Sequence, residues 1–141
     1  MDLKLNNKTA LITGASKGIG YGISETFASE GVNLILTARS ENELKALKSK
    51  LTELYRIKVE IIPLDITASE SISILIDKCK NIDFLINNAG DIPSGSLFDV
   101  NEDSWRRGWE LKVFGYINMC RAFYPILKKN GGGVIINNIG N

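Results

Sequence analysis

Histidine is absent from the 141 residues of this sequence, and cysteine is rare. Without an imidazole the chain cannot build Ser-His or Cys-His nucleophilic sites, and nearly every catalytic zinc site also needs histidine. The two cysteines, Cys79 and Cys120, lack metal-ligand spacing and occupy apolar positions of expected helices. We therefore expect no metal site and two buried free thiols, which are typical of a reducing cytoplasm.

Long apolar runs and an excess of either charge are also missing. No stretch reaches the length of a membrane span, and the first residues lack the apolar core and cleavage signal of a secretory leader. Lys and Arg number 17 against 16 Asp and Glu, a net charge of +1. Because the sequence has no surplus of basic residues, we do not expect it to bind nucleic acid. Because it has no long apolar stretch, we expect a soluble cytoplasmic protein that does not bind a membrane.

Apolar, β-branched runs alternate with stretches of helical periodicity along the whole chain. The helical stretches carry apolar residues around 19–27, 44–54 and 72–79, each on one face. Strands separated by helices form right-handed crossovers, so the pattern predicts an α/β fold with a parallel sheet covered on both faces. The strands, all expected to be continuously buried, are 9–13, 32–37, 59–64, 83–86 and 134–137.

The longest helix is predicted over residues 101–129. Apolar residues recur there at intervals of three and four, and Asn101 or Asp103 can cap its start. Pro125 lies late in this stretch and should bend the helix or end it early. The recurring residues are Trp105, Trp109, Val113, Tyr116, Cys120, Phe123 and Leu127. No linker, repeat or low-complexity tract divides the chain, so residues 1–141 are expected to form a single domain.

A glycine-rich turn lies between the first expected strand and the first helix. Residues 13–20 read Thr-Gly-Ala-Ser-Lys-Gly-Ile-Gly. A turn with few β-carbons lets the amides of a helix N-terminus approach a pyrophosphate, which is the chemistry of a dinucleotide site. Gly14 would form the turn, Gly18 would leave room for the phosphates, and Gly20 would let helix and sheet approach closely. A P-loop is excluded because Lys17 precedes the glycine.

The chain resembles the short-chain dehydrogenase/reductase family in two motifs. One is Thr-Gly-x-x-x-Gly-Ile-Gly at 13–20, and the other is Asn-Asn-Ala-Gly at 87–90, directly after the fourth expected strand. The resemblance covers the amino-terminal, cofactor-binding half of the family. It implies a Rossmann-like, doubly wound sheet of strand order 3-2-1-4-5, incomplete on its carboxyl-terminal side. The cofactor-binding residues it implies are Gly14, Ser16, Lys17, Gly18, Ile19, Gly20, Arg39, Asp65, Ile66, Asn88, Ala89 and Gly90.

Charge near the end of the second strand favours NADP(H) over NAD(H). An acidic residue there would bind the ribose 2′-hydroxyl and repel a 2′-phosphate, but Ala38 occupies that position. Arg39 follows it and Lys17 lies in the glycine turn, so two cations could converge on the phosphate. The alternative is that both are ordinary solvated charges.

The sequence departs from the family at its catalytic positions. Lys112 stands where the family has an Asn, and the expected Ser falls on Gly140 or Asn141. The family's Tyr and Lys belong after the fifth strand, where this sequence stops. Lys112 could orient a proton-relay water or act as a base if burial lowered its pKa, although a solvated lysine is the plainer interpretation. Tyr124 and Lys128 have the spacing of the Tyr-Lys pair but precede the fifth strand, so we dismiss them.

Two functions remain open from these residues. The first is an NADP(H)-dependent oxidoreductase that moves hydride between the nicotinamide and a carbonyl or alcohol substrate, as a whole or as the first half of a longer domain. The second is a dinucleotide-binding pseudoenzyme or regulatory module without turnover. Without the Tyr and Lys, residues 1–141 alone are expected to be inactive. The resemblance also implies a homodimer or homotetramer, with Trp105 and Trp109 packing within the chain or against another subunit.

Overall fold

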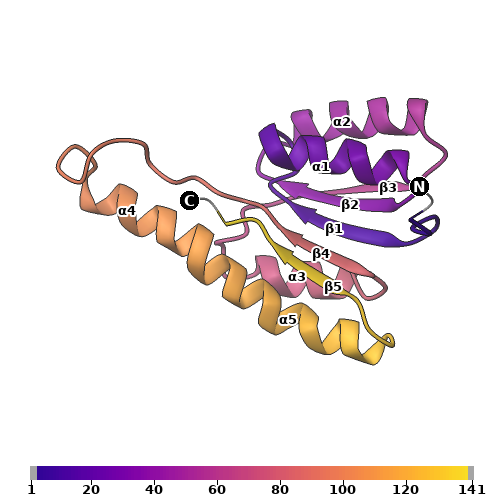
Figure 1. Ribbon diagram of the computed structural model, residues 1–141. Coiled ribbons are helices and arrows are strands. Elements are labelled where there is room, and N and C mark those ends of the chain that lie inside the picture. Colours follow the sequence, from indigo (N-terminus) through magenta and orange to yellow (C-terminus); the bar gives the residue numbers. More distant parts are fainter. Residues whose placement is uncertain (1–2, 140–141) are drawn as a thin grey trace.

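Five parallel strands form one sheet in the computed structural model, which describes residues 3–139 (Figure 1). The order β3-β2-β1-β4-β5 confirms the predicted doubly wound topology. Leu11 in the central strand lies opposite Ile35 on one side and Leu85 on the other. The strands are β1 (Thr9–Thr13), β2 (Asn33–Ala38), β3 (Val59–Pro63), β4 (Phe84–Asn87) and β5 (Val134–Asn137).

Helices cover the sheet in two layers, which Figure 1 shows above and below the strands. Because successive side chains of a strand point to opposite faces, β1 contributes Ile12 to one core and Leu11 to the other. The first core lies under α1 (Gly18–Ser29) and α2 (Glu41–Leu54), and the second under α3 (Ser71–Lys78) and α5 (Tyr116–Lys129). Leu44 and Phe123, both fully buried, are members of the two cores.

Strand burial follows position in the sheet. The inner strands β1, β2 and β4 are nearly continuously buried, as expected. The same expectation is wrong for the edge strands, because Glu60 in β3 is exposed and Val134 and Ile136 in β5 are 47% and 44% exposed. Ile135 between them packs on the α3/α5 core. An edge strand that is covered on one face alternates between buried and exposed residues.

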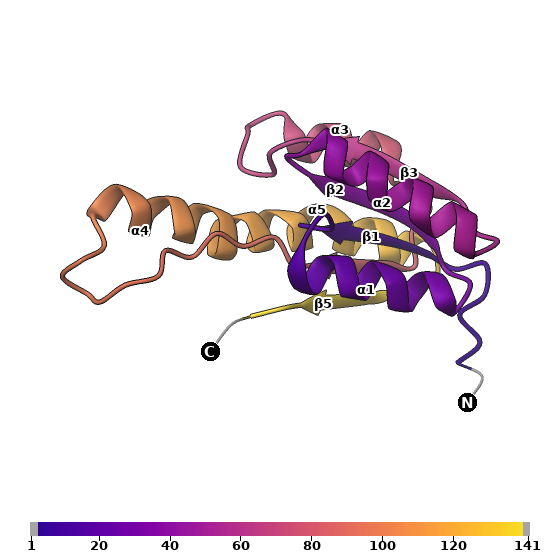
Figure 2. The ribbon, with the colours of Figure 1, turned by 90° about the horizontal axis from the view of Figure 1, so that it is seen from above.

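The long helix is present but is not a regular α-helix. It consists of α4 (Glu102–Trp109), a π-helical segment η1 (Glu110–Gly115) and α5, and α4 extends beyond the carboxyl ends of the strands (Figure 2). Asn101 caps it as predicted, by accepting a hydrogen bond from the Ser104 amide at 2.9 Å. Pro125 does not end it early, because α5 continues to Lys129.

Burial along the long helix follows the predicted pattern only in part. Tyr116, Phe123 and Leu127, which lie beyond the π-helical segment, are buried as expected. Trp109, directly before the segment, is 56% exposed, and Cys120 is only half-buried, so the expectation of a buried thiol is wrong there. Met119, which the periodicity missed, is fully buried.

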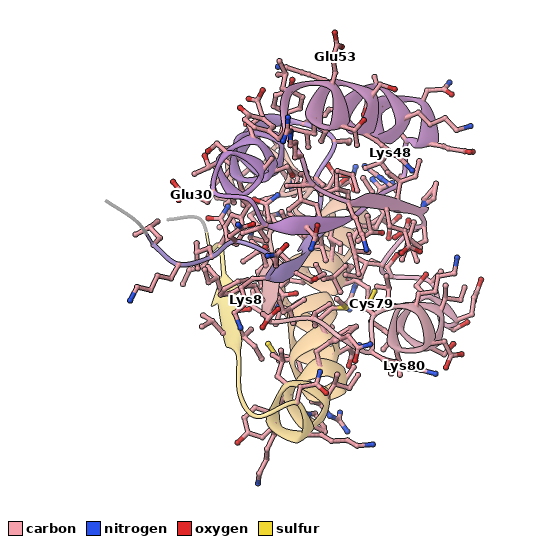
Figure 3. The ribbon with its side chains drawn as sticks, turned by 90° about the vertical axis from the view of Figure 1, so that its right-hand side faces the viewer. Lys8, Glu30, Lys48, Glu53, Cys79 and Lys80 are labelled. Atoms are coloured by element: carbon pink, nitrogen blue, oxygen red, sulfur yellow. The ribbon has the colours of Figure 1, made fainter. Side chains whose placement is uncertain are left out.

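The two cysteines differ in environment. Cys79 is buried as expected, and Figure 3 shows its side chain on the inner side of α3, whereas Glu53 of α2 points away from the molecule. Burial raises the pKa of the Cys79 thiol to about 12. Among residues 3–139 no helix is both long and apolar enough to cross a membrane, and the same residues contain no cluster of side chains suited to a metal ion.

Candidate functional site

A cleft of about 750 Å³ opens at the carboxyl ends of the strands. It lies where the strand order reverses between β1 and β4, the usual ligand position in a doubly wound sheet, on the side from which α4 extends (Figure 1). Most residues proposed from sequence line it: Gly14, Ser16, Lys17, Ile19, Arg39, Asp65, Ile66, Asn88, Ala89, Gly90 and Lys112. Gly18 and Gly20 do not line the cleft, although they belong to the same turn.

The three glycines of the turn serve different purposes. Gly14 has a φ of +63°, and a Cβ there would lie 2.7 Å from the Ala89 Cα. A Cβ on Gly20 would overlap the Gly14 carbonyl oxygen and lie 2.5 Å from the Asn88 side-chain nitrogen. Gly18 has a φ of +51° but open space around its missing Cβ. Close neighbours therefore exclude a side chain at Gly14 and Gly20, and the positive φ favours glycine at Gly14 and Gly18.

Thr13 and Asn88 fasten the glycine turn to the end of β4. The Thr13 hydroxyl accepts hydrogen bonds from the Asn88 and Ala89 amides at 3.0 and 3.1 Å. The Asn88 side chain donates to the Thr13 and Gly14 carbonyls, both at 3.2 Å, and accepts from the Asn138 side chain at 2.8 Å. The two sequence motifs are thus one hydrogen-bonded unit, in which Asn88 holds the turn in shape.

The start of α1 is open to an anion. In the described part of the chain no side chain caps this N-terminus, and its first turn contains no acidic residue. Amides at a helix N-terminus carry partial positive charge, which favours a bound phosphate. Ile19, in the same turn, is 66% exposed and gives the rim of the cleft an apolar surface.

Each of the two basic residues that were predicted to bind the 2′-phosphate is paired with a carboxylate. Lys17 Nζ lies 3.0 Å from Glu43 Oε1, and Arg39 Nη2 lies 3.4 Å from Asp91 Oδ2. The Lys17 contact is the main reason that the pKa of Glu43 is below its usual value. Glu43 and Asp91 both line the cleft but were not among the predicted residues. The Ser-x-x-Glu spacing from Ser40 is a capping-box signal that could have placed Glu43 in the first turn of α2.

Asp65 lines the cleft where the chain leaves β3. Its carboxylate accepts hydrogen bonds from the Thr67 amide at 2.9 Å and the Thr67 hydroxyl at 2.7 Å. The pKa of Asp65 is lowered first by that amide and also by the hydroxyl and the charge of Arg39, against an opposing effect of burial. Asp65 is therefore ionised at neutral pH, and Thr67 orients its carboxylate through two hydrogen bonds.

Lys112 lies at the other end of the cleft, within the π-helical segment. Its ammonium donates hydrogen bonds to the Tyr116 hydroxyl at 2.8 Å and to the Asn138 carbonyl at 2.5 Å. Burial lowers the pKa of Lys112 and raises that of Tyr116 to about 12. The lysine is therefore a fixed, partly desolvated cation beside Gly90, and the plainer interpretation of it as a freely solvated charge is wrong.

The other residues considered for catalysis from the sequence do not line the cleft or lie outside the described part of the chain. Gly140 and Asn141, on which the family's Ser would fall, lie outside the described residues. Tyr124 is 62% exposed, and neither it nor Lys128 lines the cleft, which agrees with their dismissal.

Comparison with known proteins gives consistent matches. A family model described as short chain dehydrogenase matches residues 8–139. The 12alpha-hydroxysteroid dehydrogenase of Clostridium sp. is 37% identical, and the match covers 92% of this chain and 54% of that protein.

Solved structures are similar over the same length. L-sorbose reductase of Gluconobacter frateurii, complexed with NADPH and L-sorbose, gives a TM-score of 0.89 at 31% identity and covers 96% of this chain and 53% of that one. A short chain dehydrogenase/reductase of Burkholderia phymatum in complex with NAD gives a TM-score of 0.85 at 28% sequence identity. The match covers 94% of this chain and 49% of that one. The chain thus spans about half the length of the relatives that it matches.

Proposed function

This chain belongs to the short chain dehydrogenase family, and from that premise we propose that it binds a nicotinamide dinucleotide, NADP(H) in preference to NAD(H), in an oxidoreductase acting on a carbonyl or alcohol substrate. The observation that carries the proposal is the cleft itself. It joins an uncapped helix start, the glycine turn and the Asn88 unit at the switch point of the sheet.

The residues present fit such a cofactor. The open surroundings of Gly18 leave the first amides of α1 accessible, and these amides would hold the pyrophosphate. Asp65 and Ile66 would bound the adenine, and Lys17 and Arg39 would receive the 2′-phosphate next to Ala38, which offers no competing acid. Once bound, the cofactor supplies the hydride chemistry, and the protein supplies orientation and proton handling.

Lys112 is our candidate for proton handling. Two of its three ammonium protons are directed at Tyr116 and Asn138, and the third can be donated to a water or a substrate oxygen in the cleft. Because burial lowers its pKa, this proton is released more readily than that of a solvated lysine.

The same contacts favour a second candidate, a dinucleotide-binding module without turnover. A lysine held by both Tyr116 and Asn138 has lost part of the freedom that a proton relay needs. Purified protein from the complete coding sequence distinguishes the candidates when binding of NADPH, followed by its fluorescence, is combined with a panel of carbonyl and alcohol substrates. Binding with turnover supports the oxidoreductase, binding alone supports the module, and absence of binding refutes both.

Cofactor preference is tested by Arg39→Asp. A carboxylate at the end of β2 should weaken NADPH binding at least about tenfold by repelling the phosphate and should leave or improve NADH binding. An unchanged ratio of the two affinities would show that Arg39 is not a phosphate ligand.

We also propose that the protein is cytoplasmic and assembles into dimers or tetramers through the long helix formed by α4, η1 and α5, where Trp109, Phe114 and Ile117 are exposed. Sedimentation of the purified protein tests the assembly, and a monomer at every concentration would contradict it.

A further inference from the structure

The end of the cleft proposed for the 2′-phosphate is close to electrically neutral. Lys17 and Arg39 would make it strongly attractive for a dianion, but Glu43 and Asp91 are their ion-pair partners. A phosphate that recruits either cation must therefore share it with a carboxylate or displace that carboxylate. A 2′-hydroxyl is uncharged and does not compete with these carboxylates for the two cations.

The two carboxylates differ in how easily they can leave. Arg39 and Asp91 are 69% and 67% exposed and are separated by 3.4 Å, so water can solvate both when they part. Glu43 is 38% exposed and lies 3.0 Å from Lys17. Its backbone amide is tied to the Ser40 hydroxyl at the start of α2.

Lys17 is the main group that stabilises the charge of Glu43, and the Ser16 and Ser40 side chains add smaller contributions. Oε2 is out of contact with solvent and has no hydrogen-bond partner among residues 3–139, while Oε1 contacts Lys17. If Lys17 turns to a phosphate, the Glu43 carboxylate keeps its negative charge beside a group of the same sign, and water does not reach its Oε2.

On the basis of the proposed dinucleotide function, we propose that Glu43 is a specificity-determining residue that limits the preference for NADPH over NADH. It does so by holding Lys17 and by placing a fixed negative charge beside the 2′ position. The acid that restrains phosphate binding thus comes from the first turn of α2, while the end of β2 carries Ala38.

The test is equilibrium binding of NADPH and NADH to the protein from its complete coding sequence and to Glu43→Gln. Removing the charge should strengthen NADPH binding about five- to tenfold and change NADH binding less than about twofold, because only NADPH carries the extra phosphate. Glu43→Ala removes the same charge and should act in the same direction, so it replaces Glu43→Gln if that variant does not fold.

Glu41→Gln is the matched control, because Glu41 lies on the same turn of α2 but pairs with Lys45 at 2.7 Å and does not line the cleft. It should leave the ratio of the two affinities unchanged. The proposal is overturned if Glu43→Gln lowers NADPH affinity, which would mean that Glu43 orients Lys17 for the phosphate. It is also overturned if the ratio does not move or if Glu41→Gln moves it equally. Failure of the unmodified protein to bind either cofactor would instead refute the proposed function.

Discussion

Replacing Gly20 with alanine should destabilise the fold and separate the packing role of the glycine turn from its binding role. The new Cβ would overlap the Gly14 carbonyl oxygen and lie 2.5 Å from the Asn88 side-chain nitrogen. Backbone at Gly14 cannot move aside as a flexible side chain could, so we expect an overpacking cost of about 1–3 kcal/mol.

The displaced Asn88 would also lose its hydrogen bonds to the Thr13 and Gly14 carbonyls, each worth about 1 kcal/mol. Alanine regains somewhat less than about 1 kcal/mol through its helix propensity. The free energy of unfolding of Gly20→Ala should therefore fall by about 2–4 kcal/mol.

Urea denaturation followed by circular dichroism measures this change, and Gly22→Ala is the control. Gly22 lies on the same helix, is exposed, and has nothing within 4 Å of its missing Cβ. That substitution should stabilise the protein by about 0.5–1 kcal/mol, because alanine loses less conformational entropy in a helix. Equal stability of the two variants would refute the close approach of helix and turn on which our account of the motif depends.

Two further predictions concern buried side chains. Thr13→Val removes the acceptor for the Asn88 and Ala89 amides and should lower the free energy of unfolding by about 1–3 kcal/mol. Thr37→Val, which loses one hydrogen bond to the Ile62 carbonyl, should lower it less. A smaller effect at Thr13 than at Thr37 would contradict the proposal that Thr13 holds the glycine turn against the end of β4. Because burial raises the pKa of Cys79 from 9.0 to about 12, iodoacetamide at pH 8 should alkylate Cys120 first in the native protein, as mass spectrometry can show. Since the folded-state pKa is the higher one, the stability that the neutral Cys79 thiol contributes should be complete below pH 9 and lost as the pH rises towards 12; Cys79→Ala should remove this alkaline loss.

The fold was predictable because its signals are local and mutually consistent. Each strand and helix was found from periodicity, within a residue or two except at the start of α2, which begins three residues before the predicted stretch of 44–54. The strand order followed from the resemblance carried by the two motifs. Burial of the edge strands was not predictable in the same way. Val134 and Ile136 are as apolar as the residues of β1, and only their place at the edge of the sheet exposes them.

The candidate site was predictable where a residue's backbone position decides its role. Gly14, Asn88 and Lys112 line the cleft because they directly follow strands or lie on the helix that crosses it. The pairing of Lys17 with Glu43 depends instead on side-chain directions across two helices. The π-helical segment was not predictable either, because nothing in the composition of residues 110–115 distinguishes it from a stretch of α-helix.

The glycine motif combines two requirements that one sequence pattern cannot separate. Gly14 and Gly20 are needed because backbone and Asn88 occupy the space of a side chain, so the fold alone would demand them even without a ligand. Gly18 has no such neighbour, and its conformation at the open start of α1 has no packing explanation. Gly14 and Gly20 are therefore the part of the motif that indicates the fold. Within the motif, Gly18 and the uncapped helix that begins there are the features that favour a bound dinucleotide in the cleft.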